Sequence, residues 1–207
     1  MWMDDHLDLT PQLLVRAYRT GIFPMACSRT GPIEWHSPDP RAILPLEAGA
    51  FHVPKSLARR VRSDRFTITR NQAFDRVIRA CAEPRRHHHD TWINPLLIAV
   101  YSELHRQGLA HSVEAWVEGT DEGRLLVGGL YGVALGGAFF GESMFKRATD
   151  ASKVCLVELV EHLRGRGFVL LDVQFSHPHL EQFGVAEIRR DHYLRRLEAA
   201  LRLKVTW

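Results

Sequence analysis

The most constraining feature of the sequence is the stretch from Leu125 to Phe140, which is almost continuous in small and apolar residues. Glycines punctuate it, and Gly136-Gly137 stands where a tight turn between antiparallel strands prefers glycine. We therefore expect two strands joined at this pair. Because neither strand alternates apolar with polar residues, both faces of the pair are expected to be buried inside a sheet.

Segments on both sides of this pair carry the patterns of further helices and strands. The capping signals Thr10-Pro11, Asn94-Pro95 and Thr149-Asp150 each precede apolar residues at helical spacing. We expect helices over 11–20, 72–81, 95–107, 151–165 and 190–201, and strands over 66–69, 111–117, 168–175 and 203–207. This order suits an α+β fold with a mixed sheet covered by helices.

Prolines divide the N-terminal part of the chain from the rest. Between Phe23 and Pro45 they recur too often for a long regular element, so we expect short strands in a small, irregular unit. A chain of 207 residues with 45% hydrophobic content is long enough for one core and a small satellite domain. The predicted domains are residues 1–48 and 49–207.

The absence of long apolar runs and the cysteine pattern favour a cytosolic protein. No run of about 18 apolar residues could span a bilayer, and the N-terminus lacks the basic and apolar regions of a signal peptide. Cys27, Cys81 and Cys155 are far apart and odd in number, which favours reduced thiols over disulfides or a zinc site. We expect a soluble, cytoplasmic protein that binds no membrane.

Glu142 is the first candidate for catalysis. It lies in the segment Gly141 to Phe145, at the end of a hydrophobic strand where burying a carboxylate is costly. A structural alternative is equally open at this point: Glu142 caps the following helix or pairs with Lys153.

Asp172 and Gln174 are the second candidate pair. They lie two residues apart in an otherwise apolar strand, so both side chains are expected to leave it on the same face. Buried acidic groups are often retained for function, although a satisfied hydrogen-bond pair explains them equally simply.

A basic stretch is the third candidate. Six cations stand there against the single Asp64, and a polyanion could bind them. A solvated helix face is the alternative. The cationic residues are Lys55, Arg59, Arg60, Arg62, Arg65 and Arg70.

Other chemistries find less support in the sequence. Neighbouring histidines at 87–89 cannot readily face one metal ion, and Ser143 lies in no nucleophile-elbow motif. His177 and His179 follow the Asp172 strand and are candidates for acid-base work or for plain surface groups. The glycines around Arg166 follow a helix and precede a strand, which is the wrong order for a coenzyme A pyrophosphate loop.

Several segments together resemble one protein family, the bacterial leucyl/phenylalanyl-tRNA-protein transferases, and the resemblance covers nearly the whole chain. The segments that carry it are residues 17–24, 37–41, 91–93, 111–114, 128–133, 141–145, 151–153, 172–174, 183–184 and 187–188.

The resemblance implies a small N-terminal domain and a C-terminal domain similar to the GNAT acyltransferases. It implies an enzyme without a cofactor that moves leucine, phenylalanine or methionine from aminoacyl-tRNA to proteins beginning with arginine or lysine. Proteins marked in this way enter N-end-rule degradation. The family expectation is a monomer.

The resemblance also implies roles for individual residues. Gln174 would accept a hydrogen bond from the attacking amine, with Asp172 and Glu142 completing the catalytic centre. Trp92 would stack on the terminal adenosine, and the cations from Lys55 to Arg70 would hold tRNA phosphates. The amino-acid pocket would be formed by Leu130, Phe139, Met144, Leu159 and Leu171.

Two positions depart from the best-known members of the family. Met25 and His36 stand where those members carry tryptophan, so a stacking contribution of the N-terminal domain is not expected in the usual form. Two rival functions explain only part of these features. A coenzyme A acetyltransferase would explain the fold but not the motifs, and a non-enzymatic tRNA-binding protein would explain only the basic stretch.

Overall fold

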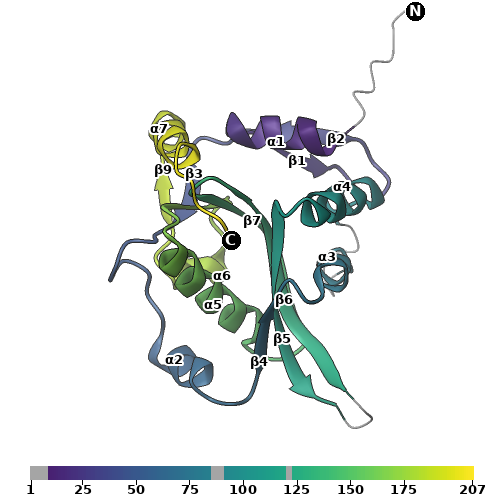
Figure 1. Cartoon of the computed structure of the whole chain (residues 1–207), viewed down its shortest axis with the longest axis vertical. Helices are drawn as coiled ribbons and strands as arrows, with labels where there is room; N and C mark the ends of the chain where they lie inside the picture. The colour runs from purple at the N-terminus through teal and green to yellow at the C-terminus, as the bar shows by residue number, and fades with distance from the viewer. Residues whose placement is uncertain (1–8, 85–90, 120–122) are drawn as a thin grey trace, which may run out of the picture.

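The protein is built around a seven-stranded mixed sheet with the strand order β4-β5-β6-β7-β8-β3-β9 (Figure 1). The computed structural model describes residues 9–84, 91–119 and 123–207, so the histidines at 87–89 lie outside it. Neighbouring strands are antiparallel except β7 and β8, which are parallel. The strands are β3 (Arg41–Leu44), β4 (Thr67–Arg70), β5 (Ala110–Glu118), β6 (Arg124–Leu135), β7 (Ala138–Lys146), β8 (Leu170–Gln174) and β9 (Ala186–Ile188).

The predicted strand pair in the glycine-rich stretch is confirmed. β6 and β7 pair as a hairpin whose turn contains Gly136, with a positive φ of 56° that favours glycine. At Gly132, where the register shifts, an added Cβ would meet the backbone oxygen of Phe140 at 2.2 Å. Glycine is therefore required there for the two strands to approach each other.

Helices cover both faces of the sheet and enclose two separate hydrophobic clusters, so the predicted α+β class with a mixed sheet is confirmed. One cluster contains side chains of α1, α3, α4 and α7, and the other contains side chains of α2, α5 and α6. The helices are α1 (Pro11–Arg19), α2 (Lys55–Val61), α3 (Phe74–Cys81), α4 (Pro95–Arg106), α5 (Ala151–Arg166), α6 (Pro178–Glu181) and α7 (Arg190–Leu201).

Two of the three predicted helix caps are confirmed. The side chains of Thr10 and Asn94 accept hydrogen bonds from the first turns of α1 and α4. Asp150 makes no side-chain cap on α5, because its backbone is left-handed with φ of 68° and its carboxylate lies 3.9 Å from Arg60. α5 runs through Gly165 and ends at Arg166, with Gly167 as its C-cap.

The strand predicted for residues 203–207 is wrong. These residues form no strand, and Trp207 instead packs over one face of the sheet. Its ring stacks on His111 with ring centroids 4.4 Å apart, and it also contacts Phe139 and His162. Aromatic packing against these side chains, together with hydrogen bonds that Arg166 donates to Thr206, holds this end of the described chain.

The N-terminal unit consists of α1 and a two-stranded antiparallel sheet of β1 (Phe23–Ala26) and β2 (Ile33–His36). The next strand, β3, lies between β8 and β9 in the large sheet. Its pairing associates residues 41–44 with the larger unit, while the division at residues 48 and 49 stays a prediction. None of the helices in the described ranges is long and apolar enough to cross a membrane.

Candidate active site

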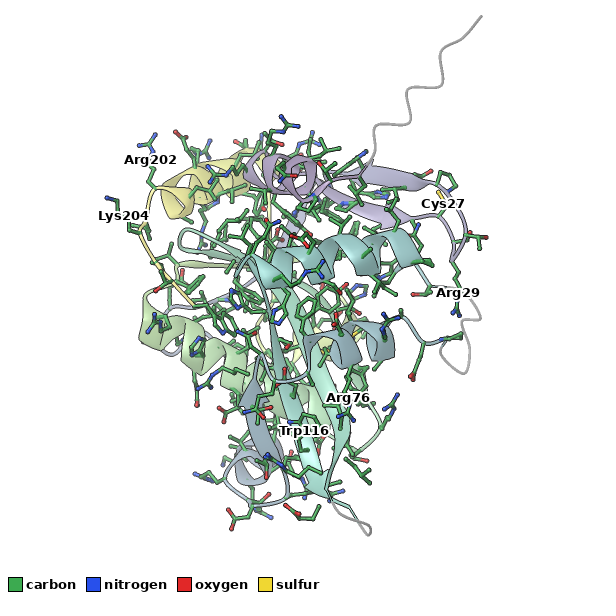
Figure 2. All side chains as sticks on the ribbon, turned by 45° about the vertical axis from the view of Figure 1, so that its right-hand side comes forward. Cys27, Arg29, Arg76, Trp116, Arg202 and Lys204 are labelled. Atoms are coloured by element: carbon green, nitrogen blue, oxygen red, sulfur yellow. The ribbon has the colours of Figure 1, made fainter. Side chains whose placement is uncertain are left out.

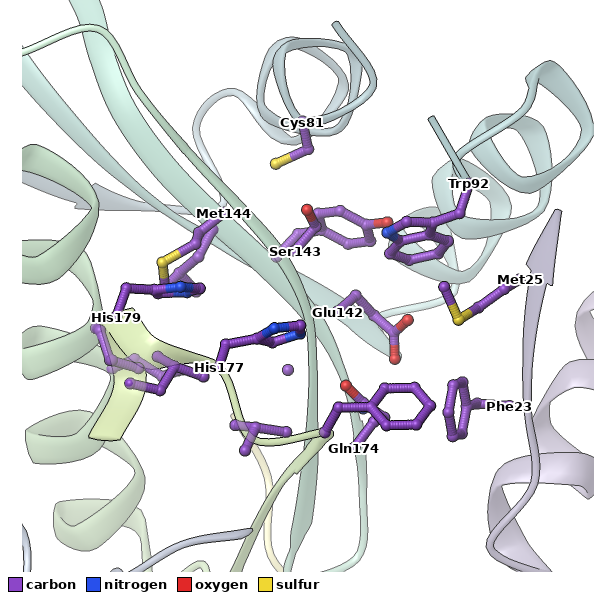
Figure 3. Close-up of a pocket in the computed structure, with 18 of the residues that line it drawn as sticks. Phe23, Met25, Cys81, Trp92, Glu142, Ser143, Met144, Gln174, His177 and His179 are labelled. Carbon is purple, nitrogen blue, oxygen red and sulfur yellow. The ribbon is translucent and has the colours of Figure 1, made fainter. Parts of the chain in front are cut away.

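A cavity of about 480 Å³ lies where strands β7 and β8 separate (Figure 3). The parallel pairing of the two strands ends at Phe140 and Asp172. Residues that follow this point on both strands line the cavity, together with side chains of β1, α5, α6 and the segment before α4. The sheet therefore opens at its centre to form a pocket.

Most of the predicted apolar pocket residues line this cavity. Phe139 does not: its ring is fully buried in the core, where it stacks against Trp207 with centroids 5.4 Å apart. The predicted residues in the wall are Trp92, Leu130, Met144, Leu159 and Leu171.

Glu142 reaches the cavity from β7 and binds two tyrosines. Tyr18 of α1 donates a hydrogen bond of 2.6 Å to Oε1, and Tyr101 of α4 donates one of 2.9 Å to Oε2. The helix-capping and Lys153 alternatives for Glu142 are thereby replaced by a contact between elements. Burial raises the pKa of the Glu142 carboxyl from 4.5 to about 7, although the two tyrosine hydrogen bonds oppose the rise.

The three groups form a closed triangle, because the hydroxyl oxygens of Tyr18 and Tyr101 also lie 2.6 Å apart. Two hydroxyl protons cannot fill three oxygen–oxygen contacts. A protonated Glu142 supplies the third proton, whereas an ionised Glu142 leaves one contact without a proton. The geometry thus favours the protonated carboxyl group, in the same direction as the raised pKa of Glu142.

Asp172 lies behind the cavity wall and is fully buried. Arg41 of β3 donates to both carboxylate oxygens, over 2.9 Å from Nε and 2.7 Å from Nη2. Tyr193 of α7 donates a further bond of 2.8 Å. Asp172 does not line the cavity, so it acts on the site through its neighbours.

One of these neighbours is Gln174, whose backbone N–H donates to Asp172 Oδ1 over 2.9 Å. Gln174 has a left-handed backbone with φ of 60°, which is unfavourable for a residue other than glycine. Its side chain lines the cavity, and its buried Nε2 atom has no hydrogen-bond partner among the described residues. Strain and an unpartnered donor at one residue are typical of a binding site.

The predicted basic stretch lies outside the cavity. Leu57 anchors α2 in the hydrophobic cluster that contains α5, which leaves the cations of this stretch on the outer surface. Lys55, Arg59, Arg62 and Arg65 are exposed, and Arg60 is half-buried beside Asp150.

Histidines contribute no metal centre within the described ranges, where no group of three or more metal-binding side chains occurs. His177 and His179 line the cavity from the start of α6, with ring centroids 5.7 Å apart (Figure 3).

Comparison with known proteins identifies the family. The profile of the leucyl/phenylalanyl-tRNA protein transferases matches residues 43–198, and that of their N-terminal domain matches residues 7–39. The chain belongs to this family. Its active site is accordingly expected to handle an aminoacyl-tRNA donor and a protein acceptor.

Individual leucyl/phenylalanyl-tRNA–protein transferases match over most of their length. The relative from Salinibacter ruber is 54% identical over 97% of this chain and 84% of its own. Those from Hyphomonas neptunium and Paramagnetospirillum magneticum are each 56% identical over 93% of this chain, and over 72% and 90% of their own.

One solved structure also aligns with this transferase. It is the C-terminal domain of an Agrobacterium fabrum protein described as a lysylphosphatidylglycerol synthetase, with 13% identity, a TM-score of 0.42, and 94% of this chain and 58% of that chain covered. That likeness is too weak to assign a fold, so the GNAT-like assignment rests on the family resemblance.

Sequence reasoning assigned no role to Tyr18, Tyr101, Tyr193 or Arg41 of the transferase. One signal was present, since buried tyrosine hydroxyls need hydrogen-bond partners and Tyr18 and Tyr101 stand on apolar helix faces. Only the tertiary structure shows that Glu142 is the partner of both.

Proposed function

We propose that this chain forms a peptide bond between the leucine or phenylalanine of an aminoacyl-tRNA and the α-amino group of a protein that begins with arginine or lysine. In this reaction the amine nitrogen bonds to the ester carbonyl carbon, and the bond from that carbon to the ribose oxygen breaks. The amine loses one proton, and the ribose oxygen that leaves takes one up to become a hydroxyl group. Aminoacyl ester and amine are sufficient reactants, so no other cofactor is required.

One observation carries this proposal within the family: the half-buried Glu142 and the buried Gln174 both line a mainly apolar cavity at the point where β7 and β8 separate. An apolar enclosure favours a leucyl or phenylalanyl side chain, and the two polar groups supply orientation. Binding in this wall would bury the side chain against Leu130, Met144 and Leu171.

Trp92 supports binding of the terminal adenosine. It lines the cavity beside Met25, and its backbone oxygen accepts a 3.0 Å hydrogen bond from Ala26 of β1. Stacking of a base on an indole is worth roughly 1 to 3 kcal/mol. Met25, which stands in place of a tryptophan, offers a polarisable thioether to the same adenosine.

Gln174 supports orientation of the attacking amine. Its amide oxygen can accept a hydrogen bond from the amine but cannot keep the proton, so another group must take it. Glu142, with its pKa raised to about 7, has a proton affinity suited to exchange at neutral pH. Its carboxylate form also favours a cationic acceptor residue. Asp172 contributes by fixing the backbone of Gln174.

The proposed enzyme acts as a monomer, as the family resemblance implies. Modification of acceptors with N-terminal arginine or lysine would direct them to N-end-rule degradation.

A donor competition tests the function. The protein is incubated with an Arg-initiated peptide and, in separate reactions, labelled Leu-tRNA, Phe-tRNA or acetyl-coenzyme A. Transfer of leucine and phenylalanine but not acetate is the expected result. Acetyl transfer would favour the acetyltransferase alternative, and tRNA binding without transfer would favour a non-enzymatic tRNA-binding protein.

A further inference from the structure

A second cavity, of about 250 Å³, adjoins the first. Glu83 lines both cavities, and Ile93 in the wall of the second directly follows Trp92 in the wall of the first. The second cavity therefore lies next to the part of the first that contains Trp92.

The charges of the second cavity favour an anion. Its charged lining residues are Arg29, Arg79 and Glu83. The Glu83 carboxylate is already bound by Arg147, whose Nη2 lies 2.6 Å from Oε1. Among the described residues that line this cavity, two arginines thus stand against one carboxylate, and that carboxylate has a cationic partner of its own.

Both arginines belong to backbone segments that are held in place by packing or by hydrogen bonds. Arg79 belongs to α3, which packs by its apolar face into the core. Arg29 lies on the loop between β1 and β2 at the edge of the N-terminal unit (Figure 2). Asn94 holds this loop by donating to the backbone oxygen of Gly31 over 3.4 Å, and Cys27 closes it by a 3.0 Å bond to Pro32. Such supports reduce the entropy lost when a ligand binds.

The rest of the lining is apolar, with Ile93, Pro95 and Ile98 among its residues. Cations beside apolar surface suit a single nucleic-acid strand, whose phosphates are charged and whose riboses and bases are not. Guanidinium groups in particular bind phosphate oxygens in a bidentate manner.

We infer that Arg29 and Arg79 form a subsite for the phosphates of the two cytidines that precede the terminal adenosine of the donor tRNA. The inference rests on the proposed function, because that function places the terminal adenosine at Trp92. The phosphates that precede the adenosine then leave the first cavity beside Ile93 and meet the two arginines. This subsite is separate from the basic stretch between Lys55 and Arg70, which we expect to hold other phosphates of the tRNA.

Donors of increasing length test the subsite. Leucyl-adenosine carries no phosphate, leucyl-cytidyl-cytidyl-adenosine carries the two internal phosphates, and Leu-tRNA carries the whole backbone. In the variants Arg29→Gln and Arg79→Gln, the KM for the trinucleotide donor and for Leu-tRNA should each rise about tenfold. The KM for leucyl-adenosine should not change.

Salt dependence gives a second readout. Each lost phosphate contact on a single strand should reduce the slope of log affinity against log salt by about 0.7. Arg195→Gln, an exposed arginine of α7 paired with Asp191, is the matched control and should leave every value unchanged.

The outcomes separate this inference from the proposed function. The subsite is refuted, while the function stands, if both variants have the same KM for the trinucleotide donor as the unchanged protein. It is also refuted if their KM for leucyl-adenosine rises as much as their KM for the trinucleotide. If the unchanged protein transfers leucine from none of the donors, the proposed function fails and takes the subsite with it.

Discussion

Tyr18 of α1 donates a 2.6 Å hydrogen bond to Oε1 of Glu142 in β7, across 124 positions of the chain. The contact ties the N-terminal unit to the carboxyl group at the centre of the candidate active site. Because Tyr101 approaches the other carboxylate oxygen from α4, three elements together determine the ionisation of one residue. The N-terminal unit therefore contributes a hydrogen-bond donor to the candidate active site in the large sheet.

Removing either tyrosine hydroxyl should raise the pKa of Glu142. In Tyr18→Phe and Tyr101→Phe the ionised carboxylate loses a donor that lowers its pKa. Since a hydrogen bond to a charged group is worth about 1.5 to 3 kcal/mol, a rise of about one pH unit or more is expected. The pH midpoint of kcat/KM for leucine transfer checks it. Tyr193→Phe, which removes a donor to Asp172 instead, is the control, and a midpoint that falls in the two test variants would contradict the account.

Glu142 should also make stability depend on pH. Its folded-state pKa is raised from 4.5 to about 7, so the folded protein binds this proton more tightly than the unfolded chain does. Stability from this group is therefore full below about pH 4.5 and is lost as pH rises towards 7, by roughly 3 kcal/mol in total. Urea unfolding of Glu142→Gln across this range should show a flatter pH dependence than the unchanged protein. Parallel curves for the two proteins would refute the predicted pKa.

The Arg41–Asp172 pair should matter far more for folding than pairs at the surface. Asp172→Ala leaves a fully buried guanidinium without its carboxylate, and we expect a loss of about 3 to 5 kcal/mol in unfolding free energy. Asp191→Ala removes an exposed partner of Arg195 and should cost less than about 1 kcal/mol. Denaturant titration compares them, and equal losses would show that the buried pair contributes no more than an exposed one.

Local sequence patterns predicted the regular parts of the fold because those parts depend on near neighbours. Gly136-Gly137 marked the hairpin turn, and Asn94-Pro95 marked the start of α4. The strand expected at 203–207 failed for the opposite reason: Trp207 packs against His111 and Phe139, which no pattern near the end of the described chain reveals.

The site was predictable in its carboxylates but not in their partners. An acidic residue in an apolar strand, such as Glu142 or Asp172, can be recognised as a candidate from the sequence alone. That Asp172 lies behind the wall, bound by Arg41, and that Phe139 lies in the core follow from the strand order and from the separation of β7 and β8. Both depend on contacts between residues far apart in the sequence.

Met144 should influence the choice of donor. Its side chain lines the cavity, and Met144→Ala would widen it by several heavy atoms. A phenylalanyl group can fill the added space better than a leucyl group, so the ratio of kcat/KM for Phe-tRNA over Leu-tRNA should rise about tenfold. Phe139→Leu, a change in the core outside the cavity, is the comparison. An unchanged ratio for Met144→Ala would place the amino-acid pocket elsewhere.

The basic stretch should act on tRNA and not on small donors. Arg59→Gln combined with Arg60→Gln should weaken Leu-tRNA binding and reduce its salt dependence, because contacts with phosphates release counterions. Transfer from leucyl-adenosine should stay as it is. If the salt slope for Leu-tRNA is unchanged, the stretch is a solvated helix face.

The central claim is that peptide bonds form from aminoacyl-tRNA at the centre of Glu142 and Gln174, and Gln174→Gly tests it most directly. Glycine tolerates the left-handed backbone at this position, so unfolding free energy should stay within about 1 kcal/mol of the original while the amide is removed. Mass spectrometry of an Arg-initiated peptide incubated with Leu-tRNA gives the answer. We predict addition of leucine by the unchanged protein and a loss of about 100-fold or more in the variant; equal rates for the two, or no addition by the unchanged protein, would contradict the account.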